Sequence, residues 1–103
     1  MVLNQLILSV DYSRVKESLN KMTELVEYIV EHLIPDGEYV IENRDGEKGP
    51  EIVIIVAKHD IGKIIGKKGR IAKSIRTLVK AANGDNPVHY NIIIEEQPEQ
   101  SEE

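Results

Sequence analysis

Two glycines flank two lysines in the segment Gly66-Lys67-Lys68-Gly69. Glycine at both corners permits a tight turn and lets a sugar-phosphate backbone approach without a Cβ atom in the way. The amides of Lys67, Lys68 and Gly69 are then expected to face a phosphate, and the two lysines add mobile positive charge. These residues favour non-covalent anion binding. A GxxG motif without context is more often an ordinary helix turn with solvated lysines, so the surrounding elements decide between the two.

Short helical segments are predicted on both sides of this turn. Residues 61–65 are long enough for one or two helical turns after Asp60, a candidate N-cap. Residues 70–83 have the apolar period of a longer helix, which residues 83–87 end. Gly69 stands just before the helix of residues 70–83. The unpaired N–H groups and the positive dipole end of that helix are therefore expected to point towards the same phosphate. The apolar positions of the longer helix are Ile71, Ile75, Leu78, Val79 and Ala82.

A first helix and three strands are predicted in the rest of the chain. Residues 13–34 carry a stripe of apolar residues at steps of three and four, and Pro35 ends it. The start of this helix, near Ser13 or near Thr23, stays open. Three short segments are predicted to be strands, at residues 38–43, 52–57 and 88–94. Residues 44–50 contain the Gly and Pro of a hairpin connection. The stripe comprises Val15, Leu19, Met22, Leu25, Val26, Ile29, Val30 and Leu33.

Charge is distributed unevenly along the 103 residues. The formal net charge is -5, yet residues 58–80 hold eight Lys and Arg against the single Asp60, so this segment carries +7 and the remainder -12. Such segregation fits a basic face on an otherwise acidic body. The chain has no cysteine, which excludes disulfides, thiolate zinc sites and a cysteine nucleophile. No secretory signal or membrane-spanning apolar run is visible, so a soluble cytoplasmic protein is expected.

The context of the turn resembles the KH family, whose signature is an aliphatic pair, GxxG and an aliphatic residue early in the next helix. Here that signature reads Ile64-Ile65-Gly66-Lys67-Lys68-Gly69-Arg70-Ile71. The predicted α-β-β-α-α-β order is that of the type II KH fold, an α+β domain with helices packed on one face of a three-stranded sheet. Residues 65–82 and 24–30 are similar in particular to the bacterial single-domain KhpA (YlqC-like) family.

The resemblance implies an RNA-binding protein without catalysis, cofactor or metal. In this family GxxG holds the backbone of about four unpaired nucleotides, and the bases lie on an aliphatic groove with low sequence selectivity. It further implies a post-transcriptional regulator or RNA chaperone. Ile61, Ile64, Ile65 and Ile71 are candidates for the groove or for the core beneath it, and Arg76 is a secondary phosphate contact. The RNA-binding residues predicted in this way are Lys63, Ile64, Ile65, Gly66, Lys67, Lys68, Gly69, Arg70 and Lys73.

Three segments are expected along the chain. Residues 22–95 form the KH domain. Residues 1–21 lie outside the resemblance and are either a helical N-terminal extension or the product of a start assigned upstream of Met22. Residues 96–103 are polar and rich in glutamate, a composition typical of a disordered acidic tail.

The alternatives to RNA binding are an enzymatic site, single-stranded DNA binding and a protein-interaction module. A phosphate-binding P-loop is disfavoured because three residues rather than four separate Gly62 from Gly66, and Lys68 stands where Ser or Thr must hold Mg²⁺. The three histidines show no spacing typical of a metal or acid-base site. Single-stranded DNA binding stays an alternative. So does a protein-interaction module, since the resemblance also implies a homodimer or a heteromer with a larger KH protein of the Jag type.

Overall fold

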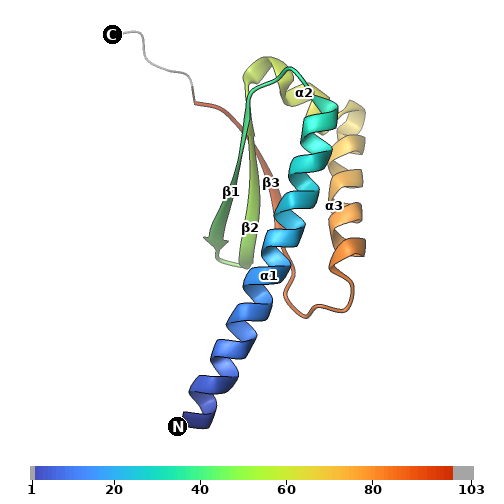
Figure 1. Ribbon diagram of the computed structural model, residues 1–103. Coiled ribbons are helices and arrows are strands. Elements are labelled where there is room, and N and C mark those ends of the chain that lie inside the picture. The colour runs from blue at the N-terminus through green and yellow to red at the C-terminus, as the bar shows by residue number, and fades with distance from the viewer. Residues whose placement is uncertain (1, 99–103) are drawn as a thin grey trace, which may run out of the picture.

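The computed structural model describes residues 2–98, and the side chains of residues 16–98. Its helices are α1 (Val2–Leu33), α2 (Ile61–Ile65) and α3 (Arg70–Asn83), and its strands are β1 (Tyr39–Gly46), β2 (Gly49–Val56) and β3 (Asn91–Glu96). Single 3-10 turns, Lys58–Asp60 and Lys67–Gly69, precede α2 and α3. This order confirms the predicted α+β architecture. In Figure 1 α1 crosses in front of β3 and α3 lies beside it on the right, and both helices contribute residues to the core on one face of the sheet.

The sheet contains three strands in the order β1-β2-β3. Strands β1 and β2 are antiparallel neighbours, with Tyr39 opposite Val56, whereas β2 and β3 run parallel, with Ile52 opposite Ile92. Parallel strands need a crossover connection, and here α2 and α3 supply it. The turn that joins the two crossover helices is the Gly66–Gly69 segment, so the sheet topology itself carries the predicted site at one end of the domain.

The β1–β2 connection is much shorter than the sequence predicts. Residues 44–50 were expected to be a loop, but pairing continues to Gly46 opposite Gly49, leaving only Glu47 and Lys48 between the strands. Main-chain hydrogen bonds between neighbouring strands do not need apolar side chains, so the ladder extends into polar residues. Pro50 is tolerated in β2 because the β2–β3 pairs begin only at Glu51.

Helix α1 supplies one side of the core through residues spaced four apart. Met22, Val26 and Val30 are buried, as is Ile34 just after the helix, and the other apolar stripe residues from Leu19 to Leu33 pack around them. Neither Ser13 nor Thr23 starts the helix, because α1 already begins at Val2. The Thr23 hydroxyl instead donates to the Leu19 carbonyl at 2.8 Å, and its Oγ1 lies 3.1 Å from Asn43 Oδ1. In residues 2–98 no helix is both long and apolar enough to span a bilayer.

Helix α3 has the predicted bounds but a different buried face. Ala72, Ile75 and Val79 are buried against the sheet and α1, while Leu78 is 51% exposed and Ala82 is exposed. Successive residues turn by about 100° around a helix, so Leu78 lies to the side of the Ile75–Val79 contact. The apolar positions Leu78 and Ala82 of the predicted helix therefore lie outside its buried face.

Strand β3 is shifted towards the C-terminus relative to the prediction. It begins at Asn91 rather than at residue 88 and takes in Glu95 and Glu96, and the Gln97 amide donates to the Val56 carbonyl at 2.7 Å. Glu96, assigned to the acidic tail from composition, is therefore part of the sheet. The remainder of that predicted tail, beyond residue 98, lies outside the described residues.

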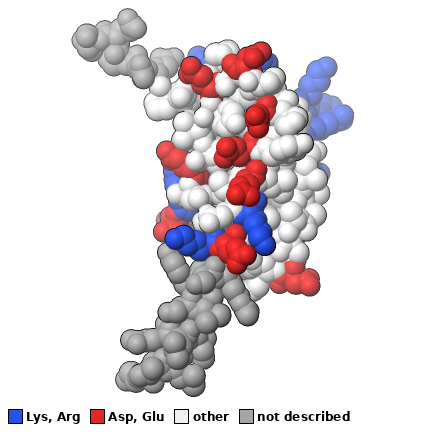
Figure 2. All heavy atoms as spheres, viewed as in Figure 1, with Lys and Arg blue, Asp and Glu red and all other residues white. Residues whose placement is uncertain are grey.

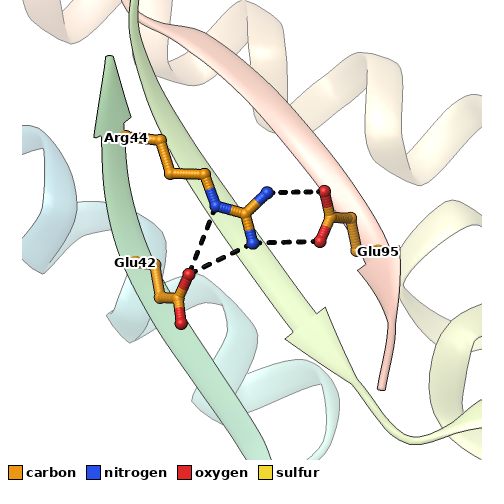
Figure 3. Close-up of polar contacts among 3 residues, drawn as sticks. All are labelled: Glu42, Arg44 and Glu95. Atoms are coloured by element: carbon orange, nitrogen blue, oxygen red, sulfur yellow. Dashed lines mark hydrogen bonds and ion pairs between the residues drawn. The ribbon is translucent and has the colours of Figure 1, made fainter. Parts of the chain in front are cut away.

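The sheet face away from the helices carries a charged bridge across all three strands. Arg44 of β1 donates to both carboxylate oxygens of Glu95 on β3, at 2.8 and 3.1 Å, and to Glu42 at 3.1 Å. Figure 3 shows the Arg44 side chain crossing β2 to reach Glu95. These hydrogen bonds, first to Glu95 and then to Glu42, raise the pKa of Arg44. The bridge lies on the same face as Val53, which is fully buried although no helix packs over it.

Candidate nucleic-acid interface

Residues 66–69, from here on the GxxG turn, include three residues with a positive φ angle. The φ angles are +77° at Gly66, +57° at Lys68 and +72° at Gly69. Lys68 is the single non-glycine residue with a positive φ in the described part of the chain. A residue other than Gly in this region is strained, and such strain is concentrated at functional sites.

The turn leaves two amides available and uses a third. The Gly69 amide donates to the Gly66 carbonyl at 3.1 Å, so the prediction that it faces a phosphate is wrong. The amides of Lys67 and Lys68 have no backbone carbonyl partner among the described residues. They lie next to the start of α3, which adds the positive end of the helix dipole, although the Arg70 amide donates to the Lys67 carbonyl.

The two glycines of the turn are required for different reasons. A Cβ atom on Gly66 would lie 2.6 Å from Cγ1 of Ile71, so this position is closed by packing. A Cβ on Gly69 would meet nothing within 4 Å. Gly69 is thus needed only for its backbone conformation, and the side of the turn that it faces is open to an approaching ligand.

Exposed and unpaired cations surround the turn. Lys67, Lys68, Arg70 and Lys73 are all exposed, and none of them forms an ion pair with any residue between 16 and 98. In Figure 2 acidic side chains spread over the front face formed by α1, while Lys and Arg gather at the upper right edge, where Figure 1 shows α3 beginning. Other Lys and Arg side chains stand among the acidic ones at the lower end of that face, so the folded chain gathers one group of cations near the start of α3 without separating all charges of opposite sign.

Lys63 differs from these four cations because it already has a partner. Its Nζ lies 3.3 Å from Oδ1 of Asp60, and His59 Nε2 lies 3.3 Å from Oδ2 of the same carboxylate. Asp60 is the N-cap residue of α2, as predicted, but it is 3% exposed and its side chain makes no capping hydrogen bond. Since Lys63 must leave a buried carboxylate to bind a phosphate, it is the weakest of the predicted cationic contacts.

The sequence left open whether four isoleucines line the groove or belong to the core, and the structure shows that their exposure differs. Ile64 is 0% exposed and belongs to the core, so its inclusion among the RNA-contacting residues is wrong. Ile65, immediately before the turn, is 37% exposed, whereas Ile61 and Ile71 are half-buried. The short helix α2 points its residues in all directions within two turns, and only packing decides which one reaches solvent.

Two basic residues further along α3, Arg76 and Lys80, differ from each other in their contacts. Arg76 donates through Nε and Nη2 to the Ile92 carbonyl of β3, at 3.3 and 3.0 Å, and so bridges the helix to the sheet edge. Lys80 is exposed one turn later. Lys80 lies in the basic segment of residues 58–80, but it was not among the predicted RNA-binding residues. Its spacing of seven residues from Lys73 was the available signal that both lie on one helix face.

A family model described as KhpA/KhpB, KH domain matches residues 23–94. The chain belongs to this KH-domain family. The match includes the GxxG turn and all three strands except the last two residues of β3. It confirms the resemblance drawn from residues 64–71.

Curated relatives agree with the family assignment. The chain is 50% identical over 62 residues to "RNA-binding protein KhpA" of Clostridium perfringens, covering 59% of this chain and 83% of that protein. It is 40% identical over 77 residues to the protein of the same name from Chlamydia pneumoniae, covering 74% and 99%. A third, from Borreliella burgdorferi, is 44% identical over 59 residues, covering 56% and 72%. These relatives are named as RNA-binding proteins and not as enzymes.

Proposed function

We propose that this protein binds single-stranded RNA at the GxxG turn. One observation carries the proposal: the turn presents two unpaired amides, Lys67 and Lys68, beside the start of α3 and among cations without ion-pair partners. Anions bind at such places because N–H groups and the helix dipole both favour negative charge. The relatives named as RNA-binding proteins make RNA the preferred anion.

The roles of the residues follow from their positions. A phosphate would lie against the Lys67 and Lys68 amides on the open side of Gly69, with Arg70 and Lys73 as further cationic contacts. Ile65 offers exposed aliphatic surface for a base. The chain has four Tyr and no Phe or Trp, so extensive base stacking on aromatic rings is poorly supplied. Phosphate contacts carry no sequence information, and low selectivity therefore follows. Such binding suits a cytoplasmic post-transcriptional regulator or RNA chaperone.

Fluorescence anisotropy with a labelled single-stranded RNA octamer tests this proposal. We expect binding that weakens as salt rises, with a slope in log affinity of about -0.7 per phosphate contact. A DNA octamer of matched sequence is expected to bind more weakly if the site uses the 2′-hydroxyl. Equal affinity for the two would favour the single-stranded DNA alternative, and no binding of either at low salt would exclude the site as a nucleic-acid clamp.

We also infer a protein partner, either a second copy of this chain or a larger KH protein of the Jag type. The observation in favour is the exposure of Leu78, 51%, on a helix that also begins at the RNA site. Two linked KH surfaces would bind one RNA more tightly through effective concentration.

Replacing Leu78 with Gln is expected to weaken self-association, because it removes the largest apolar side chain that α3 exposes. Size-exclusion chromatography with light scattering across a concentration series measures this. Tyr28→Gln is the matched control, since Tyr28 is 62% exposed on a different helix. A strictly monomeric wild-type protein at the highest concentration would remove the homodimer and leave the heteromer to be tested.

A further inference from the structure

Asp60 is the one buried charged side chain in the part of the chain that the structure describes. Its Oδ2 atom is buried and accepts no hydrogen bond from any described residue. This oxygen faces the turn that follows α1, where a Cβ atom on Gly37 would lie 2.9 Å from it. A buried carboxylate with an unpaired oxygen is costly, so this group needs its own explanation.

Two cations share this carboxylate. Lys63 Nζ lies 3.3 Å from Oδ1, and His59 Nε2 lies 3.3 Å from Oδ2. The side chain of Lys63 is 62% exposed and that of His59 is 82% exposed, so each can move without disturbing the core. One of the two must balance the charge of Asp60, because a buried charge without a partner strongly destabilises the folded state.

Other charged groups near Asp60 do not take part in these contacts. Those on the surrounding segments are exposed and form no ion pair with Asp60, His59 or Lys63: Glu31 and His32 of α1, Asp36 and Glu38 of the turn, Lys58, Arg70 and Lys73 of α3, and Glu96 of β3. Tyr39, at the start of β1, stays neutral between pH 6 and 8, since desolvation and then Glu31 and Glu27 raise its pKa. The electrostatic balance of Asp60 therefore depends on His59 and Lys63.

Lys63 also stands close to the proposed RNA site. Helix α2 leads directly into the GxxG turn, and Lys63 is three residues before Gly66. A phosphate at the turn and the Asp60 carboxylate thus compete for the same ammonium group. Protonated His59 can pair with Asp60 in place of Lys63, and histidine is the side chain that most readily changes its charge between pH 5 and 8. Release of Lys63 to RNA and protonation of His59 are then coupled, each favouring the other.

We propose that His59, Asp60 and Lys63 exchange ion pairs under the control of pH: Asp60 holds Lys63 away from RNA until His59 is protonated. The proposal rests on the proposed RNA-binding function and adds its regulation. Asp60 is a positioning residue here, since it acts on RNA only through Lys63. The direction follows from the charges. RNA binds more tightly as the pH falls, because Lys63 then becomes a further phosphate contact.

Fluorescence anisotropy with the single-stranded RNA octamer tests the exchange, at about pH 8 and about pH 6 and at constant ionic strength. We expect the affinity of the wild-type protein to rise about tenfold on acidification, roughly what one charge-assisted contact contributes. The salt slope should grow in magnitude by about 0.7, since one more phosphate is contacted. His59→Gln, at an exposed position, should remove both changes.

Variants of Lys63 separate the exchange from a direct contact between His59 and RNA. Lys63→Gln leaves His59 free to bind a proton and can still donate to Asp60, but it has no ammonium group to release. Its RNA affinity should therefore change less than about twofold between the two pH values. Lys63→Arg keeps the cation and should keep the response. Asp60→Asn should bind at both pH values as tightly as the wild-type protein does at the lower pH.

His32→Gln is the matched control for His59→Gln, because it removes an exposed histidine on α1 and should keep the full response. Circular dichroism at both pH values checks that each variant is folded. If Lys63→Gln keeps the wild-type response, His59 contacts RNA directly and the exchange is refuted. A wild-type affinity that does not depend on pH also refutes it, while the GxxG function stands. If the wild-type protein binds RNA at neither pH, the proposed function itself fails.

Discussion

Replacing both Lys67 and Lys68 with Asp is expected to abolish measurable binding of single-stranded RNA while the fold is kept. The change converts two exposed cations into two anions at the point where the phosphate is proposed to lie. The fold should tolerate it for two reasons. Asp is among the non-glycine residues that best accept a positive φ, as Lys68 has, and carboxylates are favourable next to the start of a helix such as α3.

Fluorescence anisotropy at two salt concentrations measures this loss. A variant that keeps only one of the two lysines should retain weak binding, with a salt slope smaller in magnitude by about 0.7. The matched control carries Lys16→Asp and Lys21→Asp, the same charge change at two exposed positions of α1. Circular dichroism checks that each variant is folded. Binding by the double variant equal to that of the control would show that RNA contacts another surface, and the protein-interaction function would then be favoured.

Gly66→Ala is expected to destabilise the protein by about 2–5 kcal/mol, far more than Gly69→Ala. Both glycines have a positive φ, so each substitution strains the backbone. At Gly66 the new Cβ would also lie 2.6 Å from Ile71, whose side chain packs against the core. At Gly69 the space is open, and only the conformational cost of about 1–2 kcal/mol remains.

Denaturant unfolding of the two variants gives this comparison, and RNA binding separates stability from function. Gly69→Ala should fold yet bind RNA more weakly, because its methyl group stands on the open side of the turn. Gly66→Ala should lose binding only in proportion to the unfolded fraction. Equal destabilisation by the two substitutions would mean that Ile71 can move away from Gly66, and the distinction between a packing glycine and a ligand-facing glycine would be lost.

Much of this structure follows from local sequence signals. The α2–turn–α3 unit was predicted at its observed bounds because glycines fix where helices end and because the period of apolar residues identifies a helix without reference to the rest of the chain. The same holds for the order of elements and for the position of the GxxG turn. The separation of +7 from -12 along the chain is likewise a property of the sequence.

The exact strand ends depended on tertiary structure. Residues 44–46 join β1 and Glu95 and Glu96 join β3 because a paired neighbour is present, and pairing is a contact between distant segments. Composition alone assigned residues 44–46 to a loop and Glu96 to a tail, and the predicted strand ended before Glu95. The bridge from Arg44 to Glu95, 51 residues apart, shows how the fold gives such residues a role.

The details of the candidate site were decided by packing. Nothing in the spacing of Ile64 and Ile65 indicates that the first is buried and the second exposed, since adjacent residues of a short helix differ only in what lies beside them. The pairing of Lys63 with Asp60, the internal bond of the Gly69 amide and the exposure of Leu78 have the same origin. The sequence by itself therefore determined that a GxxG turn joins two helices and where it stands in the chain. Tertiary structure decided which side chains around it are free to bind and buried the Asp60 carboxylate, because both depend on segments that meet only after folding.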